Sequence, residues 1–380
     1  MNPQVDIIKS VDDKNKYGDA LTFTLSGVNV SIANAIRRTI LSDIPQVVFK
    51  TTPYEENKAN IIANTSRLNN EIIKQRLSCI PIFIKDFENM PLKNYLMEVN
   101  VENNTENTIY VTTEDFKIKD LVSNKYISDS KIREIFPANG YTGDFIDFVR
   151  LRPKLSDDLP GEKINLTCDF SVSTAKENGM YNAVSTCSYG FTVDQEKMES
   201  ELAKKIQGWK NEGKKEDEID YESKNWKLLD GLRYTTKDSF DFAIESIGVY
   251  TNNELLDKAC EIIIHRLTDL DSLIEEDKLE IKKSENTLQN SYDIVLENED
   301  YTIGKTIEFM LYEKFYEGIK ILSYCGFKKM HTHDSQSIIR VAYKEAVEKS
   351  NIKGHLKECI DESKKVFTKM KKEFLKLMKN

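Results

Sequence analysis

The first strong pattern of hydrophobic and polar positions lies in the segment VSIANAIRRTILSDIP, residues 30–45. Its apolar residues recur at every fourth position, which predicts an amphipathic helix with one buried stripe. The stripe consists of Ile32, Ile36 and Ile40. Ser31 can cap the first turn, and Pro45 ends the helix because proline disfavours helical backbone at the residue before it. Arg37 and Arg38 border the stripe, where a solvated helix edge is the default role.

The same strand-then-helix pattern occurs a second time near the C-terminus. LTFTLSGVNVSIANAIRRTIL begins at Leu21, and YDIVLENEDYTIGKTIEFML begins at Tyr292. In each segment a strand-like run leads to a capping hydroxyl, Ser31 or Thr302, and then to a helix whose apolar and small residues match position by position. The second helix is expected to bury Ile303, Ile307, Met310 and Leu311. Two segments with one lead-in indicate a structural unit that is used twice.

Each unit also closes with an alternating strand and a long helix. The strand residues are Phe240, Phe242 and Ile244 in the first unit, and Ile339, Val341 and Tyr343 in the second. Both helices carry apolar residues at alternating steps of four and three, which suits helix–helix packing. These residues are Leu256, Cys260, Ile263, Leu267, Leu270 and Ile274, and then Leu356, Ile360, Ser363, Phe367, Met370, Phe374 and Leu377. The simplest assembly is an α+β fold of two similar halves docked as an intramolecular pseudo-dimer. Unlike a symmetric dimer, two diverged halves can present two unlike sides to partners.

A long insertion interrupts the first unit between Thr51 and about Thr236, and it is too long for a loop. It contains strand-like runs such as LMEVNVENNTENTIYVTT and EKINLTCDFSV, separated by Asn, Gly and Asp. A Glu- and Lys-rich stretch at 195–225 is expected to be a helix that leads into a solvated connector. The expected organisation is a first dimerisation unit at 1–50 plus 236–284, a mainly β inserted domain at 51–235, and a second dimerisation unit at 285–380.

Charge and cysteine usage narrow the class of protein. A net charge of −9 argues against binding of nucleic acid through counterion release. The N-terminus has no signal-peptide pattern, and no uncharged run is long enough to span a bilayer. The six cysteines are scattered without a C-x-x-C pair, which favours reduced thiols in an intracellular protein over a zinc or iron–sulfur centre. We expect no metal, no cofactor and no membrane association.

Catalytic patterns are scarce. MHTHDS brings His331, His333 and Asp334 together, and such a pair of histidines can ligate zinc, but without a third ligand a polar turn is the default. There is no phosphate-binding glycine loop and no defensible nucleophile–histidine arrangement. The stretch from Lys353 to Asn380 holds nine lysines against four acids. It could touch nucleic acid, although a solvated helix end is the default. We therefore expect a chain that is not an enzyme by itself.

Two sequence blocks carry a resemblance to a known family. NAIRRTILSDIP, followed by ANTSRLNNEIIKQRLSCIPI, strongly resembles the assembly subunits of cellular RNA polymerases, namely bacterial alpha, archaeal D and the third subunit of eukaryotic RNA polymerase II. The C-terminal ENEDYTIGKTIEFML is similar to their partner, archaeal L or the eleventh eukaryotic subunit. The matching residues of the first block are Asn34, Arg37, Arg38, Leu41, Ser42, Ile44 and Pro45. Those of the second block are Asn64, Thr65, Ser66, Leu68, Asn69, Glu71, Arg76, Leu77, Ile80 and Pro81. A chain that holds both partners resembles the fused platform subunit of large cytoplasmic DNA viruses.

The resemblance implies a non-catalytic platform subunit in transcription, which pairs its halves internally and docks the largest and second-largest polymerase subunits. Small zinc-binding subunits are further partners, and the chain is not expected to bind DNA sequence-specifically. The resemblance implies that these residues contact the second-largest subunit: Arg37, Arg38, Asn64, Ser66 and Arg76. Arginine suits such an interface because its planar fork pairs with carboxylates in two ways, although Arg76 could instead pair with Glu71 or a nearby carboxylate within its own fold.

The intramolecular pairing is assigned to apolar residues of three of the expected helices. They are Ile32, Ile36, Ile40, Ile303, Ile307, Met310, Leu311, Leu356, Ile360, Phe367, Met370 and Phe374. Many family members hold a metal cluster in the inserted domain, but Cys168 and Cys187 stand alone there, apart from Cys79. A cytoplasmic or nuclear location is expected, and a viral protein would lie in the cytoplasmic virus factory and in the virion. The alternatives are a free-standing dimerisation scaffold or adaptor of the same fold and, third, a metal-dependent enzyme that uses HTHD.

Overall fold

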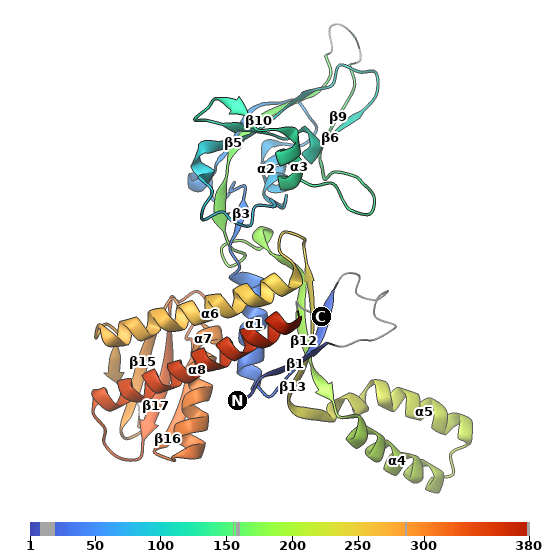
Figure 1. The fold of residues 1–380 in the computed structure, drawn as a ribbon. Helices are drawn as coiled ribbons and strands as arrows, with labels where there is room; N and C mark the ends of the chain where they lie inside the picture. The colour runs from blue at the N-terminus through green and yellow to red at the C-terminus, as the bar shows by residue number, and fades with distance from the viewer. Residues whose placement is uncertain (8–19, 155, 157–159, 286, 378–380) are drawn as a thin grey trace. The chain divides into compact units, whose positions relative to one another are not determined.

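The computed structural model describes residues 1–7, 20–154, 156, 160–285 and 287–377 (Figure 1). The chain divides into two compact units. Unit 1 comprises Met1–Ile40, Thr186–Glu245 and Asn252–Asn380, and unit 2 comprises Leu41–Ser185 and Ser246–Thr251. Helices and antiparallel sheets occur in both units. The α+β class expected from the sequence is confirmed.

Unit 1 contains a first sheet of four antiparallel strands in the order β1-β2-β13-β12. Its strands are β1 (Gln4–Ile7), β2 (Leu21–Ser26), β12 (Val184–Val193) and β13 (Thr235–Ser246). Alternate residues of β2 and β13 are buried, as the period of two along a strand requires. Phe23 lies directly opposite Phe242, and their rings stack with centroids 5.2 Å apart. Helix α1 (Val30–Ser42) follows β2, and helix α6 (Asn252–Glu275) follows β13.

The second sheet of unit 1 repeats this arrangement, in the order β14-β15-β17-β16. Its strands are β14 (Ile281–Lys283), β15 (Ser291–Glu297), β16 (Leu322–Lys328) and β17 (Gln336–Tyr343). Helix α7 (Tyr301–Leu311) follows β15 and continues into a π-helical turn, Tyr312–Gly318, and helix α8 (Lys349–Leu377) follows β17. In both sheets the chain runs from an edge strand to a central strand and a helix, and then from the other edge strand to a central strand and a long helix.

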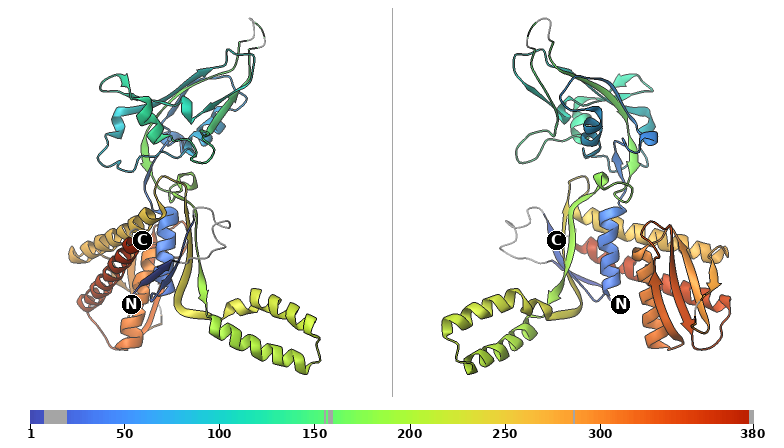
Figure 2. Two further views of the ribbon diagram at one scale, coloured as in Figure 1. Left: turned by 45° about the vertical axis from the view of Figure 1, so that its right-hand side comes forward. Right: turned by 180° about the vertical axis from the view of Figure 1, so that it is seen from behind.

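The long helices α6 and α8 lie side by side in unit 1 (Figures 1 and 2). The twelve residues expected to pair the halves are all buried, each at most 3% exposed. Near the end of α8, the ring of Phe374 meets the ring of Phe23 edge-on, with centroids 5.7 Å apart. The last described helix therefore packs against the first sheet as well as against α6.

The caps of the two repeated helices differ from the expected hydroxyls. Asn29 precedes α1, and its side-chain oxygen accepts a hydrogen bond of 2.9 Å from the Ser31 N–H. Asp300 precedes α7 and accepts the equivalent 2.9 Å bond from the Thr302 N–H. The prediction that Ser31 and Thr302 act as caps is wrong, because both residues already lie in the first helical turn. The repeat itself extends to the caps, since Asn29 and Asp300 occupy matching positions.

The stretch expected to become a solvated connector is an antiparallel helical hairpin, α4 (Gln195–Asn211) and α5 (Glu216–Leu228) (Figure 2). Met198, Leu202 and Trp226 form its small buried core. The hairpin links β12 to β13, two strands of the first sheet. For this reason residues 186–235 fall in unit 1, whereas the sequence grouped them with the inserted domain.

The boundary expected between residues 284 and 285 also falls at a different place in the structure. Strand β14 pairs with β15, with Ile281 opposite Ile294, so it belongs to the second sheet. Helix α6 ends at Glu275, and only residues 276–280 separate it from that sheet.

Unit 2 is built around a five-stranded antiparallel sheet in the order β4-β10-β5-β7-β8. Its strands are β4 (Ala59–Asn64), β5 (Tyr95–Glu102), β7 (Lys117–Asp120), β8 (Lys125–Tyr126) and β10 (Lys163–Asp169). Two smaller pairs accompany it, β6 (Ile109–Thr112) with β9 (Asp147–Leu151) and β3 (Gln46–Val48) with β11 (Ser171–Ser173). Helices α2 (Asn70–Ser78) and α3 (Asp129–Ile135) complete the unit. A buried core of aliphatic and aromatic side chains, including Phe49, Phe116, Phe136 and Phe148, holds these elements together.

Candidate functional site

The two adjacent arginines of α1 have different partners. Arg38 forms an ion pair of 2.7 Å from its Nη2 to Asp300 Oδ2, and its Nε donates a 3.0 Å hydrogen bond to Thr302 Oγ1. Both partners belong to the N-terminal end of α7, so Arg38 connects the two repeated helices of unit 1. Arg38 was expected at a docking surface, and the contacts that the structure gives it are intramolecular.

The Asp300 carboxylate is held in its charged form by this arrangement. Burial by itself would raise the pKa of Asp300, but the Thr302 backbone N–H, the Arg38 guanidinium and the Thr302 hydroxyl together lower it to about 2. A carboxylate at a helix N-terminus is also favoured by the helix dipole. The contact between α1 and α7 is therefore charge-assisted on both sides.

Arg37 remains on the outer border of α1. Its Nε and Nη2 both donate to Asn34 Oδ1, at 3.0 and 2.9 Å, one turn earlier on the same helix. Within the described part of the chain Arg37 forms no ion pair, and its side chain is half-buried. Of the two arginines, Arg37 is the one whose charge is still available to a carboxylate of another protein.

Asn64 and Ser66 build the loop that leads into α2. Asn64 Oδ1 accepts hydrogen bonds from the backbone N–H and the hydroxyl of Ser66, at 3.0 and 2.7 Å. Asn64 Nδ2 donates to the carbonyl of Leu68 and to Asn70 Oδ1. This is the local side-chain-to-backbone bonding typical of asparagine in turns. The two polar residues shape the loop, and the loop exposes Arg67, which the sequence pattern did not single out.

Arg76 ties α2 to strand β9. Its Nε donates to the carbonyl of Phe148 at 2.6 Å, and its Nη2 donates to the carbonyl of Asp147 at 2.7 Å. Glu71, the alternative partner considered for Arg76, pairs instead with Lys74 at 3.4 Å. Arg76 therefore bonds within its own fold, as the alternative prediction proposed, but its partners are backbone carbonyls and not a carboxylate.

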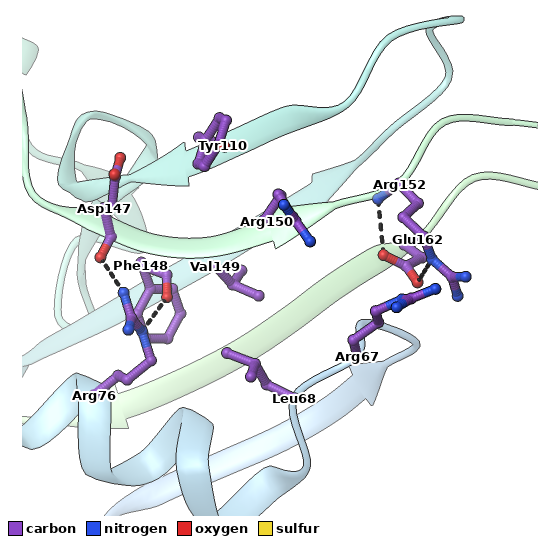
Figure 3. A pocket seen from close by; sticks show the side chains of 10 residues that line it. All are labelled: Arg67, Leu68, Arg76, Tyr110, Asp147, Phe148, Val149, Arg150, Arg152 and Glu162. Carbon is purple, nitrogen blue, oxygen red and sulfur yellow. Dashed lines mark hydrogen bonds and ion pairs between the residues drawn. The ribbon is translucent and has the colours of Figure 1, made fainter.

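Arg76 lies at one end of a groove of about 220 Å³ on unit 2 (Figure 3). Leu68, Phe148 and Val149 supply its apolar surface. Polar and charged side chains line the rest: Arg67, Arg76, Tyr110, Asp147, Arg150, Arg152 and Glu162. Residues of the α2 entry loop, of β6 and of β9 are far apart in sequence, so no local pattern indicates this groove.

Ion pairs join α6 and α8 along their borders. Lys364 Nζ lies 2.7 Å from Asp271 Oδ2, and Lys371 Nζ lies 2.5 Å from Glu261 Oε1. Further pairs are Lys357 with Glu275, Lys371 with Asp257, and Lys353 with Asp277, which follows the end of α6. Several lysines of the basic C-terminal stretch are therefore matched to acids of the neighbouring helix, which lowers the positive charge that this stretch offers to nucleic acid.

The candidate metal ligands lie in an exposed turn. His331, His333 and Asp334 connect β16 to β17, and His331 Nδ1 accepts a 3.2 Å hydrogen bond from the His333 N–H. In the described residues no three His, Cys, Asp or Glu side chains gather closely enough to hold a metal ion. Burial raises the pKa of the Cys187 thiol to about 12, which leaves it protonated and unreactive. None of the helices described has the length and apolar character needed to cross a membrane.

Comparison with known proteins gives a family match over most of the chain. The model of the RNA polymerase Rpb3/Rpb11 dimerisation domain matches residues 22–267. The DNA-directed RNA polymerases I and III subunit rpac1 of Dictyostelium discoideum is 27% identical over 184 residues, 46% of this chain and 50% of the relative. The DNA-directed RNA polymerase subunit Rpo3 of Methanobrevibacter smithii is 26% identical over 184 residues, 47% of this chain and 57% of the relative. The chain thus spans about half the length of these two relatives.

A third relative is matched over nearly all of its own length. The DNA-directed RNA polymerase subunit Rpo3 of Picrophilus torridus is 24% identical over 292 residues, which is 70% of this chain and 98% of the relative.

Proposed function

The chain belongs to the RNA polymerase Rpb3/Rpb11 dimerisation-domain family, and we propose that it is a non-catalytic assembly subunit of a DNA-directed RNA polymerase. The observation that carries the proposal is the family match over residues 22–267, together with relatives that are named as polymerase subunits. The buried seams and ion-paired helices of unit 1 suit a scaffold. The chain would contribute surfaces for assembly while another subunit carries the catalytic centre.

We further propose that the two halves of unit 1 are fused equivalents of two partner subunits. The two sheets share one strand order, and the α6–α8 seam and the Arg38–Asp300 pair join the halves. Cutting the chain between Lys278 and Leu279 leaves β14 with its own sheet, whereas a cut near Ser284 separates them. Co-expressed halves are expected to elute from gel filtration as one 1:1 complex. Halves that elute separately would contradict the fusion.

The docking surfaces belong to the proposal as well. The second-largest subunit is assigned to the residues proposed for it on α1 of unit 1 and at α2 of unit 2, each unit taken by itself. The largest subunit is assigned to other residues of the chain, and small zinc-binding subunits are proposed as further partners. Arg37→Glu should weaken co-purification of the second-largest subunit, and Arg233→Glu, on an exposed arginine of unit 1, is the matched control. Arg38→Glu is unsuitable for this purpose because it brings a carboxylate to Asp300 and so disturbs the fold. Equal recovery of the partner with Arg37→Glu and with the control would remove Arg37 from the interface.

The central experiment is purification of the tagged chain from its native setting, with mass spectrometry of its stoichiometric partners. Two very large polypeptides at a 1:1 ratio and template-dependent RNA synthesis in the eluate are expected. Recovery of the chain alone would refute the polymerase assignment and leave a dimerisation scaffold of the same fold.

The origin and location of the chain are proposed on the sequence resemblance alone. A fused pair of assembly units is similar to the platform subunit of large cytoplasmic DNA viruses, and on this resemblance we propose a location in a cytoplasmic virus factory and in the virion. Antibody staining of infected cells and immunoblots of purified virions test this proposal. Staining confined to nuclei of uninfected cells would contradict it.

A further inference from the structure

The groove on unit 2 combines positive charge with an exposed apolar surface (Figure 3). Leu68 and Val149 lie along its floor, and Tyr110 stands at its border with 58% of its surface exposed. Arg67 and Arg150 reach the groove from the α2 entry loop and from β9. An exposed aromatic side chain beside apolar and arginine side chains is the composition found at the centre of protein interfaces.

Two of the four arginines are committed to the fold. Arg152 pairs with Glu162, whose carboxylate also accepts a 2.7 Å bond from the Arg152 backbone N–H. Glu162 is only 6% exposed, so this pair acts as an internal brace at one end of the groove. Arg76 is committed at the other end through the carbonyls of β9. If Arg152 left Glu162, the buried carboxylate of Glu162 would lose its charged partner, and Arg76 would have to give up two hydrogen bonds.

The other two arginines carry free charge. Among the residues that the structure describes, Arg67 and Arg150 have no acidic partner, and both side chains are exposed. An arginine fork forms two parallel hydrogen bonds with a carboxylate and is weakly hydrated, so it pairs readily at interfaces. The groove therefore offers two unused carboxylate-binding forks on either side of an apolar floor.

We propose that this groove docks an acidic polypeptide segment of another polymerase subunit. Carboxylates of the segment would pair with Arg67 and Arg150, and an apolar side chain would lie on Leu68 and Val149. The inference rests on the proposed function only in taking the segment from a polymerase subunit. An acidic peptide fits better than nucleic acid because a peptide can place an apolar side chain on the apolar floor between its carboxylates.

The test uses the tagged chain in its native assembly. The Arg67→Glu/Arg150→Glu variant reverses the two free charges, and Lys93→Glu/Lys131→Glu makes the same change in charge at exposed lysines of unit 2 that do not line the groove. Reversing two interface charges is expected to lower recovery of one partner subunit by about 10-fold or more, because like charges then face each other. The lysine control should recover that partner at the wild-type level. Equal recovery with both variants would overturn the proposal.

A second measurement does not depend on the stability of the charge variants. A photo-crosslinking amino acid at Tyr110, which is exposed, should capture a peptide rich in Asp and Glu from another subunit. Capture of nucleic acid, of a basic peptide or of nothing would overturn the proposal. The two hypotheses fail separately: wild-type chain without large subunits refutes the polymerase assignment, whereas recovery of every partner subunit at the wild-type level with the Arg67→Glu/Arg150→Glu variant refutes only the groove.

Discussion

Phe374→Ala tests whether the first sheet depends on the far end of the chain. The Phe374 side chain is fully buried, and its ring meets Phe23, which in turn stacks on Phe242. Truncating a buried phenylalanine to alanine costs about 3–5 kcal/mol, through lost burial and the cavity left behind. An edge-to-face aromatic pair accounts for about 0.5–1.5 kcal/mol of such a loss. Leu375→Ala, at the neighbouring residue that is 37% exposed, is the matched control and should cost about 0.5 kcal/mol or less.

Amide hydrogen exchange followed by mass spectrometry resolves this effect by segment. A loss of 3 kcal/mol corresponds to exchange about 100-fold faster in amides that exchange through opening of the sheet. We expect this acceleration in β2 and β13 of Phe374→Ala, with unit 2 peptides unchanged as an internal reference. If β2 exchanged in Phe374→Ala within about threefold of its rate in Leu375→Ala, the packing of α8 on the first sheet would not stabilise it, and the reasoning would fail.

Three further changes probe charges and thiols. Lys364→Ala removes the cation beside Asp271, and both side chains are at most 20% exposed, so the free energy of unfolding should fall by about 1–3 kcal/mol. Lys365→Ala, on the exposed face of α8, is the control and should have little effect. Equal denaturant midpoints for the two variants would contradict this prediction. The folded-state pKa of Asp300, about 2, lies below its ordinary value near 4, so its contribution to stability is present above about pH 4 and is lost as the pH falls toward 2. Asp300→Asn should therefore flatten the acid limb of a stability–pH curve, and an unchanged limb would refute the linkage. Cys79 is the one exposed cysteine of the six, so one thiol per native chain should react rapidly in a thiol assay, and none should react in Cys79→Ser. Rapid reaction of several thiols would contradict this, because it would show that the buried cysteines are accessible.

The helices with regularly spaced apolar residues could be predicted from the sequence, because that spacing places the apolar side chains on one face of the helix, which is then buried. The stripe of α1 and the seams of α6 and α8 need only local spacing, and those residues are buried, apart from Leu377, whose side chain lies outside the described part of the chain. The predicted caps, Ser31 and Thr302, lie two residues after the actual caps, Asn29 and Asp300. All four side chains can cap a helix, and only the backbone conformation decides which residue precedes the first turn. The α4–α5 hairpin was missed because its Glu and Lys residues mask a narrow apolar stripe.

The candidate sites were predictable only in part, because pairing between distant residues decides which charges remain free. The sequence indicated Arg37 and Arg38 together, yet Arg38 meets Asp300, 262 residues away. Arg67 and Arg150 belong to separate elements, and they line one groove only because α2 and β9 pack together. No pattern within a single segment contains that information.

The packing of Phe374 on Phe23 has a consequence for how the chain is made. A ribosome delivers elements in chain order, so β2 and β13 leave the exit tunnel well before α8, and part of their aromatic face waits uncovered. Chaperones that bind exposed apolar surface would hold the nascent protein through this interval. A product truncated before α8 would leave that part of the face uncovered. Full covering of the aromatic face of the first sheet thus waits until α8 has been translated.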